Sequence, residues 1–139
     1  MNAWARGSFV ELLGIRIVEV AQRRLLAEME VRSELIAPNG YLHAGSVVAF
    51  ADTAAGFGCR ANLPAGAVGF TTIELKSNFL GTATEGMLSC EAILAHGGRT
   101  TQVWDATVMA QATGKTLALF RCTQLVLYPR TEGQSEDKR

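Results

Sequence analysis

The sequence has no excess of charge of either sign, which makes two classes of partner improbable. Thirteen lysines and arginines balance thirteen aspartates and glutamates over the 139 residues. A chain without a basic field has no bulk electrostatic attraction to nucleic acid or to an anionic membrane. We therefore expect neither as a partner. The hydrophobic content of 48% is enough for the core of one domain.

Cysteine and long apolar runs are also scarce. The three cysteines, Cys59, Cys90 and Cys122, are odd in number and lack the spacing of metal ligands. We expect them to be buried, reduced thiols, and we expect no metal site. The first residues lack the pattern of a secretory signal, which predicts a cytoplasmic protein. The longest weakly polar run, residues 44–59, is too short to span a bilayer and contains Asp52.

Period-two alternation of apolar and polar residues predicts that the chain is mostly β-sheet. The expected elements are a short helix over residues 8–14, strands over 15–20 and 24–32, a helix over 44–59, and strands over 70–79, 87–95, 101–111 and 116–128. Short turns link the last four strands, which predicts antiparallel pairing. This pattern indicates a single α+β domain over residues 1–130, followed by a disordered polar tail over 131–139.

One principal helix cannot cover a long sheet on both faces. The uncovered face and the edge strands then need other partners. We therefore expect the protein to be a homo-oligomer.

The helix over residues 44–59 is built mostly of small residues, and this predicts that neighbouring elements approach it closely on all sides. Asp52 lies within it, between Ala51 and Thr53. A buried carboxylate costs several kcal/mol unless it is hydrogen-bonded or protonated, so such groups are often kept for function. Asp52 is our candidate catalytic residue. The alternative is a structural role, in which backbone or hydroxyl donors satisfy it.

The start of this helix offers a second candidate element. The first amides of a helix have no internal acceptors, so the N–H groups of Ala44 and Gly45 could bind an oxyanion; the alternative is that water or a loop carbonyl occupies them. Gly45 and Asp52 are seven residues apart, which is roughly 10 Å at 1.5 Å per residue. They cannot touch one carbonyl group. If both act on the same substrate, the amides come from one chain and Asp52 from a second.

Several short motifs, in order, resemble the PaaI-like branch of the hotdog-fold thioesterases. They are NGYLHAG at 39–45, ADTAAG at 51–56, TIELKSNFL at 72–80, GR at 98–99 and WDA at 104–106. The resemblance covers about residues 35–127. It implies a hotdog fold, in which a long antiparallel sheet wraps around one central helix, and it implies hydrolysis of acyl-CoA thioesters.

The resemblance also implies roles for individual residues. Asp52 would be the general base or nucleophile, and His43 would shape the oxyanion end. The N–H of Ala44 would polarise the thioester carbonyl. Thr72 lies near the family's hydroxyl that positions the hydrolytic water, with Thr71 and Ser77 as competing candidates.

Two positions depart from the family pattern. Ala44 replaces the usual glycine after the histidine, and it keeps the N–H donor if alanine adopts the required backbone angles. Ala37 stands where the family often has asparagine or glutamine, six residues before the histidine. Asn39 is our candidate for that role, through a shifted loop.

The expected substrate is an aryl-, arylacetyl- or medium-chain acyl-CoA, and the expected assembly is a homodimer, further assembled as a homotetramer. No cofactor is required, because CoA is part of the substrate. Arg99 and Lys76 are candidates to bind the CoA phosphates, although a surface cation is more often simply solvated. Two alternatives stay open: a non-catalytic acyl-CoA binding or sensor module, and a hotdog-fold hydratase or dehydratase.

Overall fold

The computed structural model describes residues 1–130, and the predicted tail over 131–139 lies outside the described residues. The elements are η1 (Asn2–Ala5), α1 (Phe9–Leu12), β1 (Arg16–Ala21), β2 (Arg24–Glu30), η2 (Ser33–Leu35), α2 (Ala44–Ala61), β3 (Gly69–Phe79), β4 (Met87–Gly97), β5 (Thr101–Ala110) and β6 (Thr116–Leu127). All six predicted strands and the small-residue helix are present.

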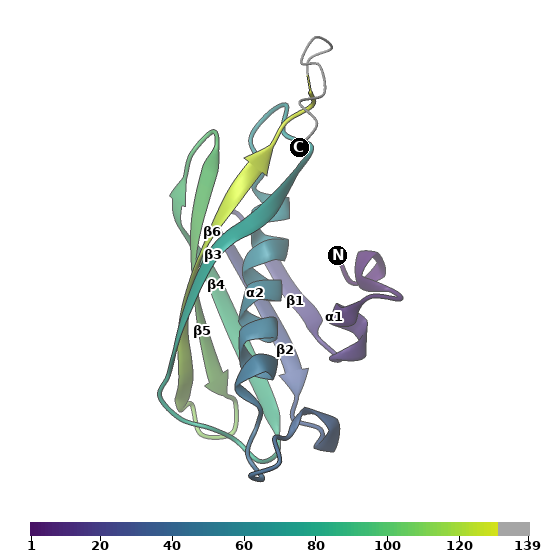
Figure 1. Ribbon diagram of the computed structural model, residues 1–139, viewed down its shortest axis with the longest axis vertical. Coiled ribbons are helices and arrows are strands. Elements are labelled where there is room, and N and C mark those ends of the chain that lie inside the picture. The colour runs from purple at the N-terminus through teal and green to yellow at the C-terminus, as the bar shows by residue number, and fades with distance from the viewer. Residues whose placement is uncertain (131–139) are drawn as a thin grey trace, which may run out of the picture.

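The six strands form one antiparallel sheet in the order β1-β2-β4-β5-β6-β3. The sheet curves around α2, which lies along its inner face (Figure 1). This arrangement confirms the predicted α+β class and has the layout of the hotdog fold. None of the helices within residues 1–130 has the length and apolar content needed to cross a membrane.

Small residues let the sheet approach α2 closely. Ala51, Ala54 and Ala55 are almost fully buried against the strands. A Cβ atom at Gly58 would lie 2.7 Å from the indole ring of Trp104 on β5, so only glycine fits there. The close packing of α2 explains why its sequence carries few large side chains.

The N-terminal helix is shorter than predicted, and Ser8 does not cap it. The Ser8 hydroxyl donates to a carbonyl of the preceding turn instead (2.5 Å), while the carboxylate of Glu11 accepts from the N–H of Gly7 (2.6 Å). Trp4 packs edge-on against Phe57 of α2, with ring centroids 4.9 Å apart. This segment therefore covers part of α2 that the sheet leaves open (Figure 1).

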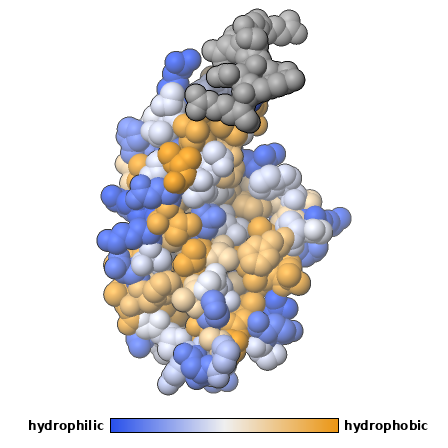
Figure 2. Space-filling view, viewed as in Figure 1, coloured by the Kyte–Doolittle hydropathy of each residue, from blue (hydrophilic) through white to orange (hydrophobic). Residues whose placement is uncertain are grey.

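Strand β3 is an open edge of the sheet. It pairs with β6 on one side, and no other strand within residues 1–130 pairs with its other side. Several of its large apolar side chains are exposed, including Ile73 (56%), Leu75 (43%) and Phe79 (49%). Hydrophobic side chains gather along this part of the molecule in the surface view (Figure 2). An exposed apolar edge strand of this length is a strong site for pairing with another strand.

Candidate active site

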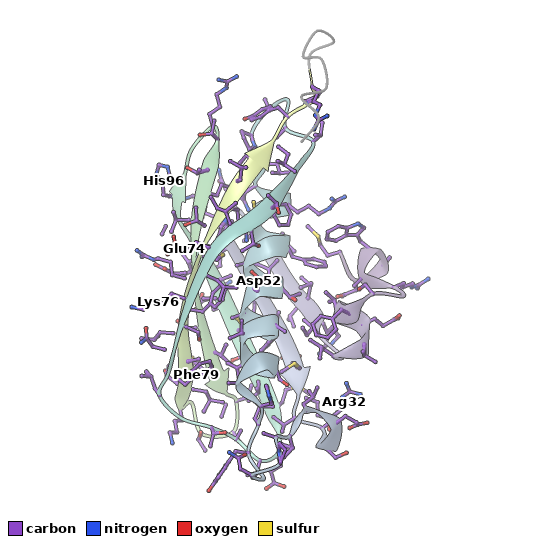
Figure 3. The ribbon with its side chains drawn as sticks, in the orientation of Figure 1. Arg32, Asp52, Glu74, Lys76, Phe79 and His96 are labelled. Atoms are coloured by element: carbon purple, nitrogen blue, oxygen red, sulfur yellow. The ribbon has the colours of Figure 1, made fainter. Side chains whose placement is uncertain are left out.

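Asp52 lies midway along α2, on the side of the helix next to β3 (Figure 3). Its side chain is partly buried, and its Oδ1 lies 3.4 Å from the hydroxyl oxygen of Thr72 on β3. Burial raises the pKa of Asp52 above its ordinary value, and the hydrogen bond from Thr72 opposes that rise. The carboxylate is therefore a stronger proton acceptor than an exposed aspartate.

The raised pKa determines how the site depends on pH. A base or nucleophile must be deprotonated, so activity through Asp52 is lost as the pH falls through its raised pKa. The titratable side chains that face α2 from the strands are Cys90 on β4 and Cys122 on β6, with Cys59 on α2 itself. Burial raises the pKa of each thiol to about 12, so all three are neutral at working pH. Among these four side chains, Asp52 is the one whose charge changes with pH.

His43 occupies the N-cap position of α2 and engages one of the two predicted oxyanion donors. Its Nδ1 accepts a hydrogen bond from the N–H of Gly45 at 2.8 Å. A Cβ atom on Gly45 would lie 2.9 Å from the same nitrogen, so the cap depends on glycine there. The sequence predicted that the N–H groups of both Ala44 and Gly45 could bind an oxyanion. The structure corrects this for Gly45, whose N–H is already bound.

The N–H of Ala44 remains available. It has no hydrogen-bond acceptor among residues 1–130, and Ala44 is exposed at the helix start. Because Nδ1 of His43 accepts the hydrogen bond from Gly45, Nε2 is the ring nitrogen of His43 that can donate to another group. The start of α2 thus carries one unbound amide next to the His43 cap.

The three hydroxyl candidates on β3 lie in different surroundings. Thr72 contacts the carboxylate of Asp52, whereas Thr71 points to the opposite, exposed face of the sheet. Ser77 lies further along β3, and its buried hydroxyl has no hydrogen-bond partner within the described residues. Asn39 is exposed and accepts a hydrogen bond from the N–H of Tyr41 (3.2 Å), which stabilises the turn before the helix.

The two candidate CoA-binding cations lie away from Asp52. Lys76 is exposed on the face of the sheet that points away from α2, opposite Arg121 on β6 (Figure 3). Arg99 lies at the β4–β5 turn, where its guanidinium is 5.5 Å from the ring centre of Tyr128 and its carbonyl accepts from the Tyr128 hydroxyl (2.6 Å). Within one chain, neither cation joins the group formed by Asp52 and Thr72.

Sequence reasoning missed Gln124, which joins this group from β6. Its side chain is completely buried, and its Oε1 lies 2.9 Å from the hydroxyl of Thr72. The signal was present in the sequence. Gln124 occupies an inward position of β6, in register with the apolar residues Phe120, Cys122 and Val126, where period two predicts another apolar side chain.

Comparison with known proteins decides the family. The sequence profile of the thioesterase superfamily matches residues 39–117, more than half of the chain. The chain belongs to the thioesterase superfamily. The predicted enzyme class is thereby confirmed, and the protein is a thioester hydrolase with the hotdog fold.

Curated relatives of this thioesterase extend over nearly its whole length. A 1,4-dihydroxy-2-naphthoyl-CoA hydrolase from Listeria monocytogenes is 33% identical over 113 residues, which cover 81% of this chain and 90% of the relative. The enzyme of the same name from Escherichia coli is 28% identical over 130 residues, covering 91% of this chain and 92% of the relative.

Solved structures share the fold of this thioesterase. A mutant of thioesterase PA1618 from Pseudomonas aeruginosa is 31% identical, with a TM-score of 0.85 over 91% of this chain and 90% of that one. Thioesterase HI1161 from Haemophilus influenzae is 26% identical, with a TM-score of 0.87 over 96% and 92%. The PaaI protein of Escherichia coli, at 24% identity and a TM-score of 0.81, shares the fold.

The thioesterase offers no group suited to a metal ion in the part of the chain that the structure describes. No three His, Cys, Asp or Glu side chains gather there in a way that could hold one.

Proposed function

We propose that this thioesterase hydrolyses an acyl-CoA to the free acid and CoA, with Asp52 as general base or nucleophile. One observation carries the proposal: a carboxylate kept in a desolvated position, where it costs stability, holds a hydrogen bond from Thr72 beside an open strand edge. A carboxylate with a raised pKa next to a place where a second chain can bind is suited to accept a proton from water.

In the general-base route, Asp52 takes a proton from water as the water oxygen attacks the thioester carbonyl. The resulting oxyanion accepts a hydrogen bond from the N–H of Ala44, and the C–S bond then breaks. The CoA thiolate leaves and receives the proton from Asp52. In the nucleophilic route, the carboxylate itself attacks, the thiolate leaves, and water hydrolyses the mixed anhydride.

An aromatic acyl group is the substrate class that we propose first. Two relatives named for an aromatic acyl-CoA span most of this chain, and arylacetyl and medium-chain acyl groups are the next candidates. A panel of such thioesters, assayed for release of free CoA thiol, tests the proposal. We expect release, with aromatic acyl groups fastest. Binding without release from any member would favour the sensor alternative, and hydration of an enoyl-CoA would favour the hydratase.

We further propose that the site is completed by a second copy of the chain, bound along β3 in antiparallel orientation. Charge complementarity selects the register. Only a twofold axis at Leu75 sets Glu74 opposite Lys76 of the partner subunit, because axes at Glu74 or at Lys76 would each oppose like charges. Both side chains lie exposed on the outer face of the sheet, where such pairs form.

The same axis brings the two catalytic elements together. Leu75 pairs with Cys122 and Thr72 with Gln124, two residues apart on β6, so the axis lies about 7 Å along the strand from Thr72 and Asp52. Ala44 precedes Asp52 by eight residues, which is about 12 Å along α2. If the twofold axis lies about midway between the levels of Asp52 and Ala44, the rotation brings Ala44 of the partner subunit level with Asp52. The charge pattern and the helix length thus favour one dimer.

Charge reversal tests this register. We expect Lys76→Glu to raise the dimer dissociation constant by roughly tenfold, since two favourable pairs become repulsive. The double variant with Glu74→Lys restores both pairs and should restore the dimer. Sedimentation measures each dissociation constant and reports whether dimers assemble further into the predicted tetramer.

The same variants separate the dimer from the CoA reading of Lys76. If Lys76 binds a CoA phosphate instead, Lys76→Glu raises KM for every acyl-CoA, leaves the dimer unchanged, and is not rescued by Glu74→Lys. An unchanged dissociation constant in both variants would contradict the register.

A further inference from the structure

Gln124 is a buried polar side chain that the proposed chemistry does not yet use. Its side chain has no exposed surface. The amide oxygen lies 2.9 Å from the hydroxyl of Thr72, and the amide nitrogen lies 3.3 Å from the sulfur of Cys122. A thiol is a weak partner for an amide in a dry interior. If this amide served only to fill space in the core, an apolar side chain could replace it with little loss of folding stability.

The other buried glutamine provides a direct comparison. Gln102 lies opposite Gln124 in the β5–β6 ladder. Its Oε1 accepts from the indole N–H of Trp104 (2.8 Å), and its Nε2 donates to the carbonyl of Asn62 (2.8 Å). Gln102 has strong partners at both ends and no contact with the site. Gln124 has its one strong partner in a hydroxyl that also touches Asp52.

The hydroxyl of Thr72 lies between two groups that compete for its single proton. The oxygen of Gln124 is 2.9 Å away, and Oδ1 of Asp52 is 3.4 Å away. With the amide oxygen facing Thr72, Gln124 and the charged Asp52 compete for that proton, and Gln124 is the closer acceptor. A half-turn of the amide exchanges its O and N positions without changing its shape. The NH₂ group then donates to Thr72, the hydroxyl proton points to Asp52, and the amide oxygen can accept from the thiol of Cys122.

We propose that Gln124 is a positioning residue of the thioester site, whose amide directs the hydroxyl proton of Thr72 toward the charged carboxylate of Asp52. When Asp52 is protonated, its own O–H donates to Thr72, and the hydroxyl of Thr72 donates to the amide oxygen instead. Both protonation states of the base therefore have a complete chain of hydrogen bonds. This inference rests on the proposed role of Asp52.

The arrangement predicts an effect of Gln124 that passes through Thr72. In Thr72→Val, the charged carboxylate loses its donor, so the acid limb of the kcat profile should move to higher pH and kcat on that limb should fall by on the order of tenfold. Gln124→Met leaves the hydroxyl without its donor, so the shift should have the same direction but be smaller, about threefold in kcat. In the double variant, Gln124→Met should add nothing to Thr72→Val.

The test is a double-mutant cycle on the pH profile of kcat, with thermal unfolding and sedimentation to establish that each variant is folded and assembled. Gln102→Met is the matched control, since it removes an equally buried amide that does not contact Thr72. It should lower stability and leave the acid limb in place. The proposal would be overturned if Gln124→Met did not shift the acid limb of the kcat profile. It would also be overturned if Gln124→Met shifted that limb equally in the wild type and in Thr72→Val.

A titration of the Asp52 carboxyl by carbon NMR separates this inference from the proposed function. It measures the pKa of Asp52 without turnover, with Asp52→Asn to assign the signal. We expect the pKa to rise in Thr72→Val and in Gln124→Met, but not in Gln102→Met. If these shifts occur in a protein whose thiol release survives Asp52→Asn, the positioning role stands and the catalytic role fails. If Gln124→Met leaves the pKa unchanged, the positioning role fails by itself.

Discussion

Replacement of Asp52 by asparagine is expected to lower thiol release by about a thousandfold and to raise the melting temperature by a few degrees. Asparagine has nearly the same shape and cannot accept a proton at neutral pH, so the loss of the base costs the rate. The same change removes a partly buried charge, which loses part of its hydration when the protein folds and so lowers the stability of the folded state. Activity and stability should therefore move in opposite directions.

The stability gained by Asp52→Asn should depend on pH. The pKa of Asp52 is raised in the folded protein, so the folded state holds the proton more tightly than the unfolded state does. Its favourable contribution is complete below the ordinary aspartate pKa and is lost as the pH rises through the raised pKa. The stability advantage of Asp52→Asn should thus be present at neutral pH and disappear in acid.

Asp105→Asn is the control for this substitution. Asp105 pairs with Arg121 on the outer face of the sheet (2.6 Å), away from α2, and that ion pair lowers its pKa. Thiol release by this variant should be unchanged. An Asp52→Asn enzyme that keeps its release rate, at the same oligomeric state, would contradict the role of Asp52.

Replacement of Ala44 by proline is expected to lower kcat by about a hundredfold or more while the fold is retained. Proline is well suited to the first position of a helix, where its missing N–H has no internal acceptor. His43 precedes it with φ −64° and ψ 133°, which are angles that a residue before proline adopts. The substitution therefore removes one N–H donor and little else. Loss of one oxyanion donor typically costs 10²–10³ in kcat.

Ala44→Gly is the matched control, because it changes the same side chain and keeps the N–H. It should retain thiol release. Steady-state kinetics should show the effect of Ala44→Pro mainly in kcat, since the donor acts on charge that develops in the transition state. Equal activity of the proline and glycine variants would exclude the N–H of Ala44 from the chemistry.

Much of the fold could be predicted from the sequence because its signals are local. Alternation set the strands, and the small residues of α2 indicated a helix packed closely by its neighbours. The sheet order could not be read in the same way. The pairing of β3 with β6, which makes β3 an edge, joins segments far apart in the chain, and nothing local specifies it.

Part of the candidate site could likewise be predicted from the sequence, and part could not. Asp52 stood out because a charge in an apolar helix is costly, and the free amides followed from helix geometry. The loss of the Gly45 donor to His43 depends on the orientation of one imidazole ring, which no sequence pattern gives. Gln124 was within reach, since a glutamine at an inward strand position breaks the alternation, but its contact with Thr72 required the β3–β6 register.

In the proposed dimer, each site combines Asp52 of one chain with the N–H of Ala44 of another. Mixing the inactive variants Asp52→Asn and Ala44→Pro, with subunit exchange, tests it directly through thiol release. Half of the randomly formed dimers carry both variants, and each of these has one intact site, so the mixture should recover about a quarter of wild-type activity. If both groups came from one chain, every site would stay defective and mixing would restore no activity, which would rule out a site shared between two chains.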